Sequence, residues 1–139
     1  MAGFVSLGTN QYIGTFKNGE DKGVENGVFV TVDYATGEAK LATADATDVY
    51  FVANEIDTIK EHGIDDVDYK TEAGKFLRLY KAVAGNILVT TAAEGLEVGD
   101  EVSIGANGQA VKKSLAEASF VVKEKTSEYG QDTYRLLAL

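Results

Sequence analysis

Short runs of alternating apolar and polar residues, separated by tight-turn signals, recur along this chain. The clearest example is the stretch Gly95–Glu124. Val102 and Ile104 alternate there with polar residues, which predicts a strand with one buried face. Asn107-Gly108 follows, and because both residue types tolerate a positive φ angle, the pair predicts a two-residue hairpin turn. The segment Ala118–Glu124 is rich in β-branched and aromatic residues and predicts a third strand.

A similar hairpin followed by a strand is predicted earlier, within Val28–Glu55. Val28, Val30 and Val32 share one face of the first predicted strand, with Phe29 on the other. Residues 39–42 form the return strand and residues 48–53 the third. Two interpretations remain open: the fold contains two related β units, or short β units resemble one another by chance.

The remaining segments give the fold class. Phe76, Arg78 and Tyr80 alternate with Leu77 and Leu79, which predicts a strand with those two sets of side chains on opposite faces. Residues 86–91 form a strand that pairs with it or turns a corner, and residues 132–138 form a closing strand. With about 8–10 short strands and at most one or two short helices, the pattern predicts an all-β protein, either a small β-barrel or a β-sandwich.

A chain of 139 residues fits one domain. Residues 1–15 are expected to form an N-terminal arm or an edge strand, and residues 16–139 a single β-rich domain. Residues 54–74 form an acidic excursion, in which Ile56–His62 fits a short helix ended by Gly63.

The composition excludes several classes of function. Thirteen basic against twenty-two acidic residues give a net charge of −9, so direct binding to nucleic acid is not expected. The chain has no cysteine, and His62 is its one histidine, which excludes zinc sites built from two or more of these residues. No run is apolar and long enough to span a membrane, and the first residues lack the pattern of a signal peptide. The chain is expected to be made and kept in the cytoplasm unless it leaves within a larger particle.

No motif for catalysis or cofactor binding is recognisable. A triad of the Ser-His-Asp kind would have to use His62, which lies in the acidic excursion. An EF-hand loop started at Asp66 would place Lys70 and Thr71 at its fifth and sixth positions, which do not fit. A calcium site of another kind and a solvated acidic loop both remain open there. We therefore expect no enzymatic activity, no catalytic residue, no cofactor and no metal ligand.

Two segments are candidates for binding a partner. Lys112, Lys113, Lys123 and Lys125 could form a basic patch for an acidic partner, although solvated strand edges account for them equally well. The apolar start of the chain is either an edge strand or an arm that adds a strand to a partner's sheet. Its candidate binding residues are Phe4, Val5, Leu7, Tyr12 and Ile13.

The segment Glu97–Ile104, followed by Ala106–Ala110, resembles the core of the head decoration (capsid cement) proteins of tailed bacteriophages. In that core a Gly-Asp step leads into a strand, a glycine turn and a second strand. Residues Val24–Asn54 and Phe76–Thr91 also resemble structural proteins encoded beside phage major capsid genes. The resemblance covers most of the chain.

This resemblance implies a small β-rich structural protein of the virion. Such a protein is made in the cytoplasm of the host bacterium, binds the phage major capsid protein on the outer capsid surface and stabilises the shell. It binds neither nucleic acid nor membrane. The family implies a homotrimer whose N-terminal arm contributes a strand to the capsid, so the five apolar residues near the N-terminus become candidates for capsid binding. The sequence is also compatible with a monomer or dimer.

The sequence leaves two other functions open. The chain could be a tail-tube or neck component of the same kind of particle, or a carbohydrate- or calcium-binding β-sandwich module.

Overall fold

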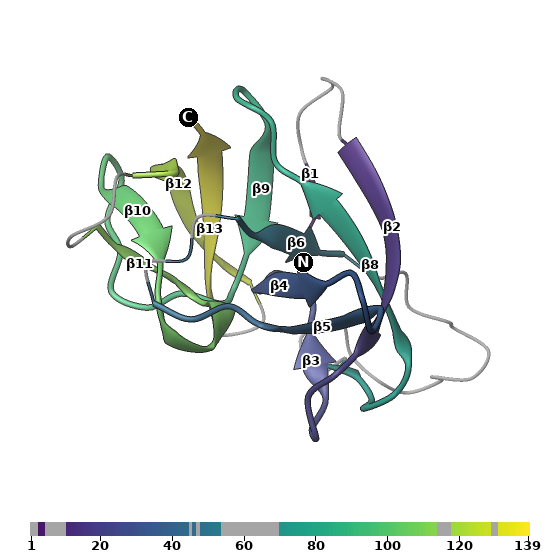
Figure 1. The fold of residues 1–139 in the computed structure, drawn as a ribbon. Helices are drawn as coiled ribbons and strands as arrows, with labels where there is room; N and C mark the ends of the chain where they lie inside the picture. Colours follow the sequence, from purple (N-terminus) through teal and green to yellow (C-terminus); the bar gives the residue numbers. More distant parts are fainter. Residues whose placement is uncertain are drawn as a thin grey trace.

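The computed structural model describes residues 3–4, 11–44, 46, 48–53, 70–113, 118–128 and 131–139 (Figure 1). Within these ranges the chain forms thirteen strands and one short 3₁₀ helix, η2 (Ala106–Gly108), which confirms the all-β prediction. The sequence predicted fewer strands because β1, β3 and β7 have two residues each and leave no alternating pattern.

The strands form a six-stranded sheet, a closed barrel and a small ribbon, so the predicted barrel is present and a separate sheet accompanies it (Figure 1). The six-stranded sheet has the order β1 (Gly3–Phe4), β9 (Ile87–Thr90), β13 (Gln131–Ala138), β12 (Phe120–Glu128), β10 (Glu101–Ile104) and β11 (Ala110–Lys112). The closed barrel has the order β2 (Gln11–Asn18), β5 (Glu38–Leu41), β4 (Phe29–Asp33), β6 (Tyr50–Val52) and β8 (Phe76–Lys81). The ribbon pairs β3 (Val24–Glu25) with β7 (Lys70–Thr71).

Strands β4 and β6 form the part of the barrel wall that packs against the six-stranded sheet, with a hydrophobic core on each side. Val30 and Val52 point into the barrel core, whereas Phe29 and Phe51 point into a second core against the sheet. Phe29 packs on Phe51 with 5.5 Å between ring centroids and on Phe120 of β12 with 5.3 Å. Full burial of each such ring stabilises the fold by about 1.5–3 kcal/mol, so these two strands join the two halves of the molecule.

The predicted single buried face of residues 101–104 is wrong. Val102 and Ile104 are buried as expected, but Ser103 between them is buried too. β10 pairs with β11 on one edge and with β12 on the other, and the burial of Ser103 shows that its second face is covered as well. An alternating pattern shows which side chains are polar, but it does not show whether other segments of the chain cover the second face of the strand.

The turn after β10 confirms one prediction and corrects another. Asn107 and Gly108 both have positive φ angles, 58° and 68°, as the sequence predicted. The connection is longer than two residues, however, because it includes η2 and is closed by a hydrogen bond from the Gly105 amide to the Gln109 carbonyl at 2.8 Å. The added length carries Gly108 to the barrel, where its amide donates to the Ala42 carbonyl at 2.8 Å.

The two predicted β units have the same strand order. β4 pairs with β5 on one side and β6 on the other, and β10 pairs in the same way with β11 and β12. A common origin of the two units remains an interpretation. The segment 86–91 turns a corner, because β8 belongs to the barrel and β9 to the sheet.

The acidic excursion lies largely outside the described residues, including the predicted helix Ile56–His62. Its end, Lys70–Thr71, forms β7, and the buried Asn18 ties that strand to the barrel. The Asn18 side-chain amide donates to the carbonyl oxygens of Lys22 and Thr71, each at 3.0 Å. Across the described part of the chain, no helix has the length and apolar character needed to cross a membrane.

Candidate interaction face

Strands β2 and β8 form the barrel wall on the side away from the six-stranded sheet (Figure 1). They pair antiparallel, and Leu77 and Leu79 of β8 point inward and are fully buried. The intervening side chains of β8 therefore point outward, as the sequence alternation predicted. The outward residues of the two strands are defined here as the aromatic face: Tyr12, Thr15, Lys17, Phe76, Arg78 and Tyr80.

A β-bulge near Gly14 decides which residues of β2 join this face. The register pairs Gly14 with Leu79 and Tyr12 with Tyr80, so the β2 strand carries one extra residue at this point. Gly14 has a φ angle of 141°, which favours glycine. The extra residue reverses the alternation, so Ile13 packs against the barrel core while Tyr12 lies outside, 49% exposed.

The outward side chains contact one another. The rings of Tyr12 and Tyr80 lie 5.3 Å apart at 54°, and the Arg78 guanidinium lies 5.3 Å from the Tyr12 ring centroid, within cation–π range. Phe76, at 60% exposure, extends this apolar surface. Tyr and Arg dominate the energetics of protein interfaces, and side chains already held by neighbours lose less entropy on binding. This face therefore has the composition and order of an interaction surface.

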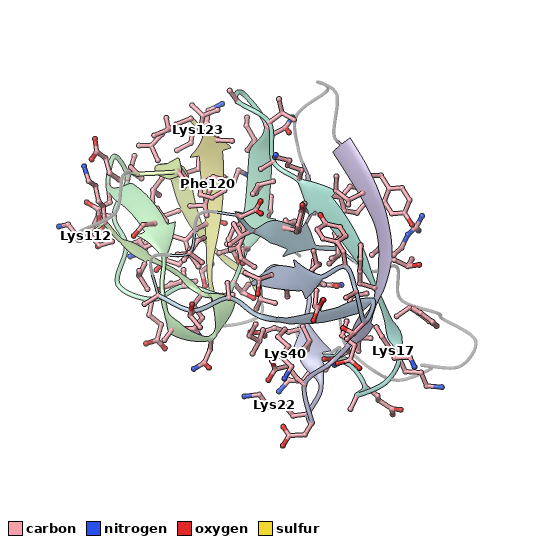
Figure 2. The ribbon with its side chains drawn as sticks, viewed as in Figure 1. Lys17, Lys22, Lys40, Lys112, Phe120 and Lys123 are labelled. Carbon is pink, nitrogen blue, oxygen red and sulfur yellow. The ribbon has the colours of Figure 1, made fainter. Side chains whose placement is uncertain are left out.

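The aromatic face is also locally basic. Lys17 and Arg78 are its charged members, and neither β2 nor β8 contains an aspartate or glutamate. Figure 2 shows Lys17 near the end of β2, on the barrel side of the molecule. Two positive charges thus stand together on a chain whose net charge is −9.

The candidate residues near the N-terminus do not share one described surface. Phe4 lies in β1, which is an edge strand paired with Leu88 of the chain's own β9. Tyr12 and Ile13 lie on opposite sides of the barrel wall. Val5 and Leu7 lie outside the described residues. The role of these residues in binding a capsid stays a prediction.

Sequence reasoning missed Lys17, Phe76, Arg78 and Tyr80 as site residues. A signal was available, because Phe76 and Tyr80 are large aromatic residues on the face of an alternating strand opposite two leucines. Aromatic residues on the outward face of a strand either pack against another layer of the same protein or stay exposed, where a partner can bind them. The partnership with β2 could not be deduced, since it depends on long-range pairing.

The predicted basic patch is not a uniformly positive surface. Lys113 pairs with Glu101 at 3.4 Å and Lys125 with Glu97 at 3.3 Å. Lys112 lies 3.9 Å from Asp100. Figure 2 shows Lys112 and Lys123 projecting from separate elements, β11 and β12. Because acidic neighbours on the same chain offset these lysines, the patch is a poor candidate for docking an acidic partner.

One tyrosine at the barrel wall has a perturbed acidity. The hydroxyl groups of Tyr34 and Tyr50 lie 2.6 Å apart and share a hydrogen bond. This bond, together with the burial of Tyr50, raises the pKa of Tyr50 to about 12. Tyr34 itself is 66% exposed and packs edge-on against Phe16 at 5.8 Å. The pair joins β6 to the turn that follows β4.

Among the described residues, no group of three or more histidine, aspartate or glutamate side chains could hold a metal ion. Most of the acidic run considered for calcium, Asp65–Tyr69, lies outside the described residues.

The structure defines a class of all-β domain in which a closed barrel and a six-stranded sheet lie on either side of a common hydrophobic core. Among solved structures, the fold is similar to that of the N base of head fiber gp8.5 in bacteriophage phi29. The TM-score is 0.58 at 14% sequence identity, and the match covers 90% of this chain and 92% of that chain. The resemblance to phage head decoration proteins is thus confirmed at the level of the fold. No protein-family model and no curated protein sequence matches the chain.

Proposed function

We propose that this chain is a structural protein of a phage virion that binds the outer surface of the capsid and stabilises the shell, without enzymatic activity. The observation that carries the proposal is the fold shared with the base of a phage head fiber, across 90% of this chain. The match also covers 92% of that chain, so it extends over the whole domain and does not reflect one common sheet alone.

The physical properties of the domain support this proposal. Two hydrophobic cores pack against opposite sides of β4 and β6, so the barrel and the sheet form one packed unit that can dock repeatedly on a lattice. An interface of standard size buries about 1,600 Å² in total. Repeated at every site of a shell, such an interface links neighbouring capsid subunits and opposes their separation. The partner in this proposal is the phage major capsid protein.

The proposal is tested with capsids from a phage whose copy of this gene has been deleted. Purified protein is added in increasing amounts, bound protein is measured by sedimentation, and capsid disruption is followed during heating. We expect saturable binding and a higher disruption temperature. If the protein does not bind saturably, the proposal is contradicted. If it binds but does not raise the disruption temperature, capsid binding is supported and the stabilising role is contradicted.

The N-terminal candidates need a separate variant. A chain lacking residues 1–10 loses Phe4, Val5 and Leu7 but keeps β2 with Tyr12 and Ile13. If the arm carries the contact, this variant no longer binds capsids. The matched control is Phe76→Ala in the full chain, which changes the aromatic face through β8 and leaves the N-terminal arm intact. A truncated chain that binds like the full chain contradicts the arm prediction.

A further inference from the structure

Three Asn-Gly steps occur in the chain, at Asn18, Asn26 and Asn107. Asparagine followed by glycine is especially prone to spontaneous deamidation, because glycine has no side chain to hinder the attack of its backbone nitrogen on the asparagine carboxamide. The reaction requires that nitrogen to be released from other contacts and to approach the carboxamide carbon. The fold therefore decides which of the three steps reacts.

In the folded protein a hydrogen bond holds each of these glycine nitrogens away from the reaction. While such a bond persists, the nitrogen keeps its proton and does not act as a nucleophile. Deamidation at each step therefore requires a local opening that breaks the bond. Each glycine amide donates to a carbonyl oxygen of a distant segment at 2.8–2.9 Å: Gly19 to Ala39, Gly27 to Val52 and Gly108 to Ala42.

The steps at Asn18 and Asn26 are held by further contacts. Asn18 is 2% exposed, and its side-chain amide donates to two backbone carbonyl oxygens at 3.0 Å. Its side-chain oxygen accepts a hydrogen bond from the Glu20 amide at 2.9 Å. Beside Asn26, the buried Gly27 also accepts a hydrogen bond at its carbonyl oxygen, from the Thr90 hydroxyl at 2.7 Å. Opening either step therefore breaks several contacts at once.

Asn107 is held more weakly. It lies in the middle of η2, where both Asn107 and Ala106 are exposed. Within the described part of the chain, no residue forms a hydrogen bond with the Asn107 carboxamide. The bond from the Gln109 amide to the Ala106 carbonyl is long, at 3.4 Å. The amide of Gly108 fixes this step to the barrel, so the opening of one short turn frees the nitrogen beside the carboxamide.

We propose that Asn107 is the site at which the folded protein deamidates, and that the docking of Gly108 on the barrel sets the rate. Hydroxide removes the proton of the Gly108 amide, and the nitrogen attacks the Asn107 carboxamide carbon. Ammonia leaves with a proton taken from water as the succinimide ring closes. Water then hydrolyses the succinimide at either carbonyl, which yields aspartate or isoaspartate at position 107.

The two products affect the fold differently. Aspartate keeps the backbone and adds a negative charge at an exposed position. Isoaspartate carries the chain through the side chain, so it lengthens the backbone directly before Gly108. That glycine has no room to shift, because a Cβ atom added to it would overlap the Phe29 carbonyl oxygen. Isoaspartate should therefore undock the turn, which makes the reaction an irreversible weakening of the junction between sheet and barrel. This inference does not rest on capsid binding.

Deamidation is followed in the purified protein at mildly alkaline pH, by peptide mapping with mass spectrometry. The same incubation in urea gives the rates for the unfolded chain, in which the three steps should react alike. In the folded protein we expect Asn107 to react at least about tenfold faster than Asn18 and Asn26, because fewer contacts must open. If Asn107 reacts no faster than the other two, the inference is overturned.

Two variants test the route. Asn107→Gly keeps a residue that adopts the positive φ angle and removes the carboxamide, so deamidation in this turn should disappear. Leu79→Ala weakens the barrel core and accelerates any reaction that requires global unfolding. Through a local opening, the rate at Asn107 should stay within about twofold of the wild type in this variant, whereas the rate at Asn18 rises. Equal acceleration at both sites contradicts the local route. Should Leu79→Ala fail to fold, a low concentration of urea takes its place.

The effect on the junction is measured with aged protein. The form with isoaspartate at position 107 is isolated by chromatography and denatured with urea beside the Asn107→Asp variant, which has the same charge on a normal backbone. We expect a lower unfolding midpoint for the isoaspartate form. Equal midpoints contradict the undocking of the turn.

Discussion

Gly108 lies so close to Phe29 that a Cβ atom added to Gly108 would overlap the Phe29 carbonyl oxygen. The contact joins the turn of the second β unit to the backbone of the first. Hydrogen bonds surround it: the Gly108 amide donates to the Ala42 carbonyl at 2.8 Å, and the Ala42 amide donates to the Phe29 carbonyl at 3.0 Å. The turn therefore connects the six-stranded sheet to the barrel as well as reversing the chain.

The first prediction concerns this contact. Gly108→Ala should lower the free energy of unfolding by about 3 kcal/mol or more, because the added carbon meets backbone and the φ angle of 68° disfavours an L side chain. Urea denaturation measures the change. Gly37→Ala is the matched control, since its φ is 73° but no atom lies within 4 Å of the added carbon. It should cost about 1–2 kcal/mol. Equal losses in the two variants would contradict the close contact.

The second prediction tests the two faces of β8. Leu79→Ala removes a fully buried side chain of the barrel core and should lower the free energy of unfolding by about 2–5 kcal/mol. Phe76→Ala, three residues earlier, removes a side chain that is 60% exposed and should cost less than about 1 kcal/mol. Thermal unfolding of both variants measures the difference. A larger loss for Phe76→Ala would mean that the strand faces are assigned the wrong way round.

The third prediction concerns the paired tyrosines. Tyr34→Phe removes the hydrogen bond that raises the pKa of Tyr50 to about 12, so that pKa should fall toward 10.0. Ultraviolet absorbance during alkaline titration records tyrosinate formation. Tyr12→Phe is the control, because Tyr12 packs on Tyr80 and Arg78 away from this pair. An unchanged titration curve for Tyr50 after Tyr34→Phe would contradict the assigned cause.

The same shift predicts a dependence of stability on pH. The pKa of Tyr50 is higher in the folded state than its ordinary value of 10.0, so the folded state holds the proton more tightly. This contribution to stability is fully present below about pH 10 and is lost as the pH rises through about 12. The wild type should therefore lose more unfolding free energy than Tyr34→Phe across that interval, as measured by urea denaturation.

The fourth prediction concerns the lysines of β11 and its end. Lys112→Gln/Lys113→Gln breaks two exposed contacts, with Asp100 and Glu101, and should change the free energy of unfolding by less than about 1 kcal/mol. It should leave capsid binding unchanged, because these lysines are offset by acidic neighbours. The sedimentation assay of the wild type provides the comparison. A clear loss of binding would restore the basic patch as a docking surface.

Local residue patterns predicted the strands that have one buried and one open face. In β8, leucine alternates with larger outward residues, and the structure shows this alternation unchanged. The positive φ angles at Asn107 and Gly108 were predictable because few other residues adopt them. The same reasoning failed for Ser103, whose burial depends on the strands and segments that surround β10.

The candidate site likewise combines features that the sequence predicted with features that only the tertiary structure shows. Tyr12 was identified from the sequence, but simple alternation cannot place it outward, because one extra residue at Gly14 reverses the pattern. Arg78 and Tyr80 join Tyr12 only through the pairing of β2 with β8, across more than sixty positions of sequence. The sequence did not show which acidic residues would lie beside the lysines of the basic patch, and only folding brought Glu97 beside Lys125.

The sequence by itself therefore determined the all-β class, most of the longer strands and the excess of negative charge. These properties follow from side-chain polarity, turn chemistry and composition, which are local or additive. Only the tertiary structure decided that a barrel and a sheet lie on either side of a common hydrophobic core, that Tyr12 and Arg78 lie on one face, and which charges offset one another. Those outcomes depend on strand pairing and packing between distant segments, and no local pattern contains that information.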